Sequence, residues 1–213
     1  MVGGHLKSLK DAVKKGEHVS IFIQDEDLDS SILPSSLSIN IVYEDDYLLI
    51  VNKPADVQMM PSKLHPQDTL ANRLQAYYKK NSISSGIHFV NRLDTEASGL
   101  ILVAKNRFIK YLFNDKTGTN VTREYHAILD GILDFKSHCI DLPISKSDDM
   151  NLKEVSMDGE ECETSYEVVE EYKNFSHVKI EENLGKTIRL EFILHIFMRQ
   201  SLPTRFITRR SIM

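Results

Sequence analysis

The sequence predicts an α+β domain built around a large mixed or antiparallel sheet. Segments with strand-like patterns outnumber helical ones, and they lack the regular alternation with helices that a doubly wound parallel sheet requires. With 213 residues the chain can bury one good core and at most a small appendage, so a single main domain is expected. No internal repeat or low-complexity tract is visible in the sequence.

The first 38 residues are expected to lie outside that domain. Residues 1–24 are expected to form a helix over Leu6–Lys15, a turn at Gly16 and an alternating strand over Val19–Ile23, which is too little to fold alone. Residues 25–38 are polar, rich in serine and contain Pro34, as is typical of a linker. The main domain is therefore expected to begin at residue 39.

Two apolar, β-branched segments at the start of the main domain predict a hairpin. They span Ile39–Tyr43 and Tyr47–Asn52, and three acidic residues separate them. The pair Lys53-Pro54 ends the second strand, because proline cannot donate to a sheet ladder. Asp68 is the expected N-cap of the helix that follows. The buried stripe of this helix is expected to comprise Leu70, Leu74, Tyr77 and Tyr78.

Two further apolar strands are expected to hold a polar loop between them. Ile87–Val90 leads into the segment Asn91–Gly99, and Leu100–Ala104 leaves it. A helical pattern follows over Asn106–Asp115. The remaining strands are expected at Arg123–Asp130, Glu163–Tyr172 and His177–Glu181.

Composition limits the class of protein without fixing its function. The chain is 41% hydrophobic and 27% charged, and no apolar run approaches the roughly 18 residues that cross a bilayer. No export signal is visible and the two cysteines are far apart, so a cytoplasmic protein with reduced thiols and no membrane partner is expected. The net charge of −5 does not decide nucleic-acid binding, which depends on local cations. The cations that could gather on one face are Lys53, Lys63, Arg73, Lys79, Lys80, Arg92, Lys105 and Arg107.

The loop Asn91–Gly99 is the segment with the most chemical content. It places Arg92 and Asp94 two residues apart, among small residues and between two apolar strands. Loops held by a rigid scaffold often carry functional groups. From these residues alone, however, the simpler interpretation is that Asp94 closes a turn and pairs with Arg92 at the surface.

Three ordered motifs give the chain a family resemblance. The first is Tyr43-Glu44-Asp45 with Val51-Asn52-Lys53-Pro54-Ala55, the second is Arg92-Leu93-Asp94 with Ser98-Gly99-Leu100 and Ala104-Lys105-Asn106, and the third is Glu124-Tyr125 with Ala127 and Gly131. Together they resemble the RluA family of RNA pseudouridine synthases, over about residues 37 to 187. Residues 6–24 look like the tail of the S4-like RNA-binding module that often precedes such catalytic domains.

The resemblance implies an isomerase that converts uridine to pseudouridine in a stem-loop of ribosomal or transfer RNA, and a pseudouridine synthase catalytic domain as its fold. Asp94 would be the catalytic carboxylate, acting as nucleophile or as base, and Tyr125 would stack on the base and assist proton transfer. Arg92 would help to fill the space that the flipped uridine leaves. Lys53 would contact RNA or simply mark a strand end. The reaction needs no cofactor, and no protein partner is evident; Glu96 is interpreted as a solvated loop charge.

Three positions depart from the family pattern. Asn91 stands where the family usually has histidine, Asp56 where it usually has glycine and Ala97 where it usually has threonine. Asp56 is the most consequential departure, because glycine would permit a backbone conformation that aspartate adopts less easily.

The resemblance ends near Thr187. Residues 39–187 are therefore expected to form the catalytic domain, and residues 188–213 an aberrant basic tail. We hypothesise that the coding frame slips at this point, because permissible codons read one frame over spell family-like motifs; sequencing the gene across Thr187 tests this. On that hypothesis Arg189 is not the family arginine that pairs with the catalytic carboxylate, and activity is expected to be weak or absent.

Two other functions remain open at this point. One is a catalytically inactive, truncated RNA-binding relic of the same family. The other is a hydrolase that uses Asp94 with a bound metal, which the sequence does not favour because His65, His88 and His126 lack recognisable ligand spacing.

Overall fold

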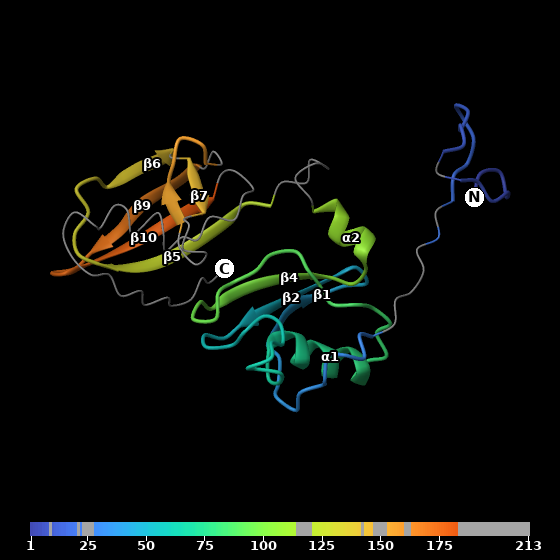
Figure 1. The fold of residues 1–213 in the computed structure, drawn as a ribbon, viewed down its shortest axis with the longest axis horizontal. Helices are drawn as coiled ribbons and strands as arrows, with labels where there is room; N and C mark the ends of the chain where they lie inside the picture. Colours follow the sequence, from blue (N-terminus) through green and yellow to red (C-terminus); the bar gives the residue numbers. More distant parts are fainter. Residues whose placement is uncertain are drawn as a thin grey trace.

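The computed structural model describes residues 1–8, 10–20, 22, 28–113, 121–141, 143–146, 153–159 and 163–182. These residues form two four-stranded sheets, a two-stranded sheet and two helices (Figure 1). The first sheet has the order β1-β2-β4-β3. Its strands are β1 (Ile41–Glu44), β2 (Leu48–Lys53), β3 (His88–Phe89) and β4 (Gly99–Ala104).

The second sheet has the order β5-β10-β9-β6. Its strands are β5 (Arg123–Asp130), β6 (Ser137–Asp141), β9 (Glu163–Glu171) and β10 (Phe175–Glu182). The short pair consists of β7 (Ile144–Lys146) and β8 (Lys153–Val155), and the helices are α1 (Leu70–Lys80) and α2 (Arg107–Leu112). All strand pairs in the described part of the chain are antiparallel, so the predicted α+β class with a mixed or antiparallel sheet is confirmed.

The helix expected over Leu6–Lys15 is wrong. The described residues of this segment are turns and irregular chain, and Val2 and Val19 are joined only by an isolated bridge. Leu6 is 88% exposed and Val13 49% exposed, so the described residues of this segment do not bury an apolar face. A helix of about ten residues without such packing is only marginally stable in water.

The core of the first sheet lies between the sheet and α1, which covers one of its faces in Figure 1. Alternate residues of β2 point toward the helix, since a strand directs successive side chains to opposite faces. The helix contributes three of its four predicted stripe residues, whereas Tyr77 is only partly buried. The buried cluster comprises Leu49, Val51, Val57, Met59, Leu70, Leu74, Tyr78, Ile101 and Val103.

The N-cap of α1 is Thr69, one residue later than predicted. The backbone amide of Asn72 donates to the Thr69 hydroxyl oxygen (3.3 Å), and the Asn72 carboxamide oxygen accepts from the Thr69 amide (3.1 Å), which makes a capping box. Asp68 has φ of +64° and accepts from the hydroxyl of Ser35 (2.7 Å) instead. This contact with Ser35 occupies the Asp68 carboxylate, and the next residue, Thr69, caps the helix.

The described part of the expected linker packs along α1. The Asn72 side chain donates to the carbonyl of Leu33 (2.6 Å), and the Gln75 side chain donates to the carbonyl of Asp29 (2.8 Å). Ile32 is buried as well. Residues 28–38 are therefore attached to the body that contains the first sheet.

Residues 183–213 and residues 23–27 lie outside the described residues. The expected tail, the position of the proposed frame slip, the first three residues of the expected linker and the last residue of the strand expected before it fall there. β6, β7 and β8 were not predicted, because Ser137–Asp141 and the segments around it mix polar residues with few β-branched ones.

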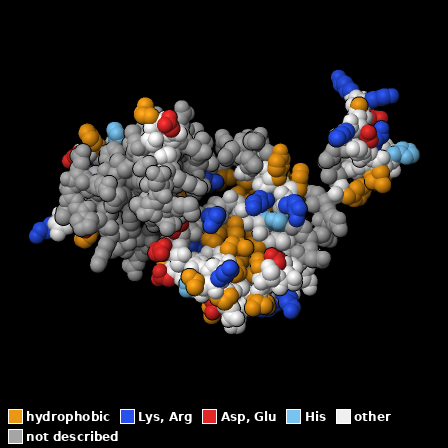
Figure 2. Space-filling view, viewed as in Figure 1, with side chains coloured by type: hydrophobic (Ala, Val, Ile, Leu, Met, Phe, Trp, Pro, Cys, Tyr) orange, Lys and Arg blue, Asp and Glu red, His pale blue; other side chains and the backbone are white. Residues whose placement is uncertain are grey.

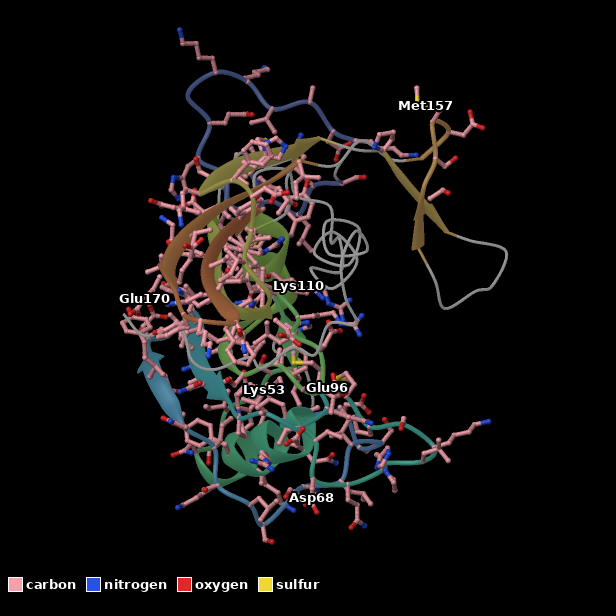
Figure 3. The ribbon with its side chains drawn as sticks, turned by 90° about the vertical axis from the view of Figure 1, so that its left-hand side faces the viewer. Lys53, Asp68, Glu96, Lys110, Met157 and Glu170 are labelled. Atoms are coloured by element: carbon pink, nitrogen blue, oxygen red, sulfur yellow. The ribbon has the colours of Figure 1, made fainter. Side chains whose placement is uncertain are left out.

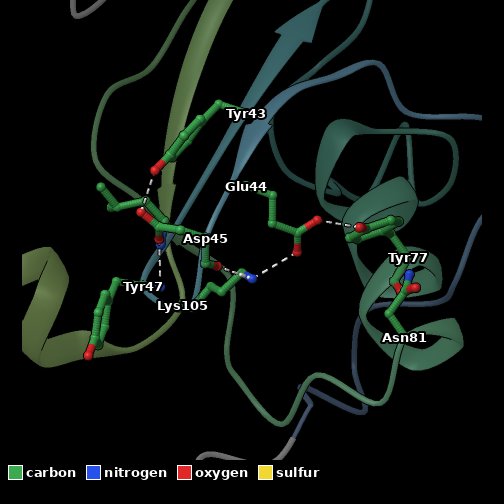
Figure 4. A network of polar contacts seen from close by, with 8 residues as sticks. Tyr43, Glu44, Asp45, Tyr47, Tyr77, Asn81 and Lys105 are labelled. Atoms are coloured by element: carbon green, nitrogen blue, oxygen red, sulfur yellow. Dashed lines mark hydrogen bonds and ion pairs between the residues drawn. The ribbon is translucent and has the colours of Figure 1, made fainter.

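A polar network ties β1 to α1 and to the end of β4 (Figure 4). The carboxylate of Glu44 accepts from the Tyr77 hydroxyl (2.5 Å) and pairs with the Lys105 ammonium (2.8 Å), which also donates to the carbonyl of Asp45. The hydrogen bond to Glu44, aided by partial burial, raises the pKa of Tyr77 to about 12. The acidic turn between β1 and β2 thus fixes the hairpin onto the helix.

The capping box predicts a measurable loss of stability. Thr69→Ala removes the hydroxyl that accepts from Asn72, and we expect the free energy of unfolding to fall by about 1 kcal/mol. Thr69→Ser keeps that hydroxyl and is expected to stay within ~0.5 kcal/mol of the wild type. Urea unfolding measures both variants, and equal losses would show that the methyl group rather than the cap matters.

Candidate active site

The loop between β3 and β4 has the alternating exposure of an extended segment. Arg92, Asp94 and Glu96 are exposed, whereas the residues between them are partly buried. In an extended chain, residues two apart point to the same side. Arg92 and Asp94, which precede the bend at Thr95 and Glu96, are therefore presented on the same outer side of the loop, and Asp94 is not buried in the core.

An apolar contact holds the inner side of this loop. Leu93 packs against the buried cluster of the first sheet, and the start of β4 approaches it closely. Gly99 has φ of +145°, and a Cβ at this position would lie 3.6 Å from Cδ1 of Leu93. Glycine suits this backbone conformation, which other residues rarely adopt. Leu93 thus fixes the position of its two charged neighbours.

Lys53 lies beneath the same loop with none of its surface exposed. Its Nζ donates to the carbonyl oxygens of Pro54 (3.0 Å), Val57 (2.7 Å) and Thr95 (3.0 Å). An ammonium has three N–H groups, so every donor is satisfied. Lys53 therefore joins the end of β2 to the turn after it and to the loop that carries Asp94.

Burial lowers the pKa of Lys53 to about 8, and the nearby carboxylates of Glu96, Asp56 and Asp94 oppose this shift. The Arg73 guanidinium lowers the pKa slightly further. The same interactions show that Asp94 and Glu96 lie within electrostatic range of the buried ammonium. Figure 3 places Lys53 and Glu96 next to one another, between α1 and the second sheet.

Asp56, which replaces a family glycine, does have the backbone conformation that glycine favours. Its φ is +61°, in the left-handed region. Aspartate is among the few residues other than glycine that visit this region with modest strain. The turn after Lys53-Pro54 therefore keeps a glycine-like shape, and the Asp56 carboxylate adds negative charge near the Lys53 ammonium.

Tyr125 comes from the second sheet. It lies on β5 opposite Ile180 of β10 and is partly buried. Lys53, Arg92 and Asp94 lie at one end of the first sheet. The four predicted site residues therefore come from both sheets. Sequence reasoning did not assign a role in this site to Arg73 of α1, whose Nε is buried without a hydrogen-bond partner among the described residues.

The charge of the chain is distributed unevenly between the two halves. Residues 39–113 contain nine Lys and Arg against seven Asp and Glu, whereas residues 121–182 contain six against sixteen. Figure 2 shows Lys and Arg side chains beside exposed apolar ones over the first sheet and α2. Two of the eight expected surface cations are not available to a ligand, because Lys53 is buried and Lys105, with 13% of its side chain exposed, is bound to Glu44.

Among the described residues, no group of three or more His, Cys, Asp and Glu side chains could hold a metal ion. His126 instead lies 2.9 Å from His177 across β5 and β10, between their ring nitrogens, and contacts Glu124. Neither α1 nor α2, the helices of the described chain, has the length and hydropathy of a membrane span.

Comparisons with known proteins converge on one family. Residues 47–191 match the family described as RNA pseudouridylate synthase. The chain is 28% identical over 189 residues to the Bacillus subtilis protein named uncharacterized RNA pseudouridine synthase YjbO, covering 87% of this chain and 66% of that protein. It is 30% identical over 180 residues to ribosomal large subunit pseudouridine synthase D of Haemophilus influenzae, covering 84% of this chain and 55% of that protein.

The fold agrees with these sequence matches. The solved structure of human RNA pseudouridylate synthase domain containing 1 superposes with a TM-score of 0.59 at 23% identity, over 73% of this chain and 63% of that one. A second solved structure, of human RNA pseudouridylate synthase domain containing 4, superposes with a TM-score of 0.58 at 19% identity, over 74% of this chain and 64% of that one. The chain spans between about half and two thirds of the length of these relatives.

The buried lysine generates a prediction about stability. Lys53→Met removes the three donors and leaves three carbonyls without partners, so we expect the free energy of unfolding to fall by about 2–4 kcal/mol. Lys110→Met, at an exposed position of α2, is the matched control and is expected to change it by less than ~0.5 kcal/mol.

The size of this loss should depend on pH. The pKa of Lys53 is about 8 in the folded chain against an ordinary value of 10.5, so between these values the unfolded chain binds more protons. The stability contributed by this group therefore rises with pH through that window. Denaturant unfolding from pH 7 to pH 10 should show a growing gap between wild type and Lys53→Met; a constant or shrinking gap would contradict the lowered pKa.

Proposed function

Because the chain belongs to the RNA pseudouridylate synthase family, with the motifs of its RluA branch, we propose that it isomerises uridine to pseudouridine in structured RNA. The observation that carries the proposal is the family match over residues 47–191, which includes Lys53, the loop with Asp94 and β5. The exposed position of the Asp94 carboxylate above a buried cation supports it, since a group that reacts with RNA must be accessible.

The proposed reaction rearranges bonds within one nucleotide. The bond between N1 of uracil and C1′ of ribose breaks, the base rotates, and a bond between C5 and C1′ forms. A proton leaves C5 and another is taken up at N1, so the composition of the nucleotide is unchanged. The protein must supply a positioned carboxylate and a route for the proton, and no external group enters the balance.

Asp94 is proposed as this carboxylate. It lies on the outer side of the loop, and its backbone neighbour Thr95 is held by Lys53. The carboxylate of Asp94 lies within electrostatic range of the buried Lys53 ammonium. Glu96 is an exposed carboxylate on the same loop, which makes it the natural comparison in mutagenesis.

The remaining residues receive supporting roles. Arg92 is exposed beside Asp94, and its guanidinium suits stacking and phosphate contact in the space that a flipped uridine leaves. Tyr125 would stack on the flipped base and assist proton transfer from the second sheet. The burial of Lys53 and its three carbonyl partners support a role in holding the loop rather than a contact with RNA.

Ribosomal RNA is the preferred substrate class of this proposal. The relatives from Haemophilus influenzae and Neisseria meningitidis are named as ribosomal large subunit pseudouridine synthases. The cations of the first half of the chain would contact phosphates, while the acidic second half would repel them. Transfer RNA is the competing substrate, and mapping pseudouridines in both RNA pools with and without the gene separates the two.

Asp94→Asn tests the proposed carboxylate. We expect pseudouridine formation to fall at least about a hundredfold, because the amide cannot act as nucleophile or base, while RNA affinity stays within a few-fold. Glu96→Gln makes the same charge change on the same loop and is expected to retain most of the activity. Tritium release from C5-labelled uridine in RNA measures the reaction, and filter binding measures the affinity.

Two outcomes would overturn this proposal in different ways. A loss of activity in Glu96→Gln with none in Asp94→Asn would move the catalytic role to Glu96. A wild-type chain that binds RNA but releases no tritium would support the inactive RNA-binding relic instead of the enzyme.

A further inference from the structure

The edge of β4 continues to be paired after β3 has ended. His88 faces Ala104 and Phe89 faces Val103 in the ladder, and the amide of Val90 still donates to the carbonyl of Leu102 (2.8 Å). In a regular antiparallel ladder the amide of Leu102 would return a bond to the Val90 carbonyl, and Leu100 would face the residue after Asn91.

The side chain of Asn91 occupies these two places. Its Oδ1 accepts from the amide of Leu102 (2.8 Å), and its Nδ2 donates to the carbonyl of Leu100 (3.0 Å). One carboxamide therefore bonds β4 at two points, as a backbone segment would. The Leu102 amide and the Leu100 carbonyl therefore keep a partner while the main chain of the loop leaves the sheet.

The main chain of the loop leaves the edge of β4 at Asn91. Because Asn91 Nδ2 donates to the Leu100 carbonyl, the backbone amide of Arg92 does not need to, and the chain can turn outward. The next residues then show their alternating exposure, with Leu93 inward and Asp94 outward. Asn91 and Lys53 thus hold the loop on both sides of Asp94, at Asn91 itself and at Thr95.

We propose that Asn91 is a positioning residue for Asp94, which acts by replacing the strand hydrogen bonds of β4 at the point where the catalytic loop leaves the sheet. This inference rests on the proposed function. Asn91 does not contact the reacting atoms in it; its effect is on the placement of the Asp94 carboxylate. A displacement of a catalytic group by about 1 Å can cost a hundredfold in rate.

The chemistry of the two bonds limits which side chains can replace asparagine. The position requires one donor and one acceptor in the same plane. A carboxylate has no donor, so Asn91→Asp loses the bond to the Leu100 carbonyl, and repulsion between the two oxygens moves the side chain away and weakens the bond from the Leu102 amide as well. A neutral imidazole has one donor and one acceptor, whereas an imidazolium has two donors and cannot accept from Leu102.

These differences define the experiment. Asn91→Asp is expected to lower kcat about a hundredfold with little change in KM, and to speed hydrogen exchange at the amide of Leu102. Asn91→His is expected to retain activity above about pH 7.5 and to lose it as the imidazole is protonated near pH 6.5. The wild type and Asn91→Asp should not show this acid loss, so the pH profile separates positioning from a general loss of stability.

Asn81→Asp is the matched control. Asn81 follows the end of α1, and its Nδ2 also donates to a backbone carbonyl, that of Tyr77 (2.8 Å). The substitution removes an equivalent bond at the C-terminal end of α1, outside the loop, and we expect kcat and the exchange of Leu102 to match the wild type.

Three results would overturn the inference. Unchanged exchange of Leu102 in Asn91→Asp would show that the carboxamide does not hold β4, and faster exchange with wild-type kcat would show that the anchor does not position Asp94. A pH-independent Asn91→His variant would contradict the hydrogen-bonding argument. Absence of pseudouridine in the wild type would instead overturn the proposed function, and hydrogen exchange would then decide the anchor alone.

Discussion

A lysine charge inside the first sheet is stable only if its N–H groups find acceptors, and the geometry of the candidate loop follows from that requirement. Lys53 meets it with three carbonyls from separate parts of the chain. Lys53 also faces Gly99, the last residue of the loop, in the β2–β4 ladder. The loop is therefore tied to β2 at the carbonyl of Thr95 and again at Gly99. The buried charge thus converts an exposed polar loop into a fixed one.

The two lysines of the family-like motifs serve the two ends of the same sheet. Lys53 holds the end at which β2 finishes and β4 begins, and Lys105 binds Glu44 and Asp45 at the opposite end. Both lysines were among the cations that could gather on one face, and the structure uses both inside the protein. Affinity for phosphate must then come from the exposed cations, among them Arg92 beside the proposed carboxylate.

Much of the fold was predictable because it rests on local patterns. The β1–β2 hairpin, α1, β4, β5, β9 and β10 all follow from apolar periodicity and turn residues, and their positions were found to within a few residues. The N-cap at Thr69, the irregular chain over residues 6–8 and 10–15 and the bonds of Asn91 were not predictable, because each depends on a contact with a distant segment or on its absence. Burial of Lys53 was hidden for the same reason, since a lysine before proline normally marks an exposed strand end.

The charges around the loop are nearly balanced, and this balance matters for a polyanionic ligand. Lys53, Arg73 and Arg92 bring three positive charges to the region, and Asp56, Asp94 and Glu96 bring three negative ones. A lone carboxylate would repel RNA phosphates, whereas a carboxylate within a neutral cluster does not add long-range repulsion. Lys53 keeps this neutrality at pH 7 because its pKa, although lowered by burial, remains at about 8. The residue that fixes the loop therefore also makes its carboxylate compatible with an RNA surface.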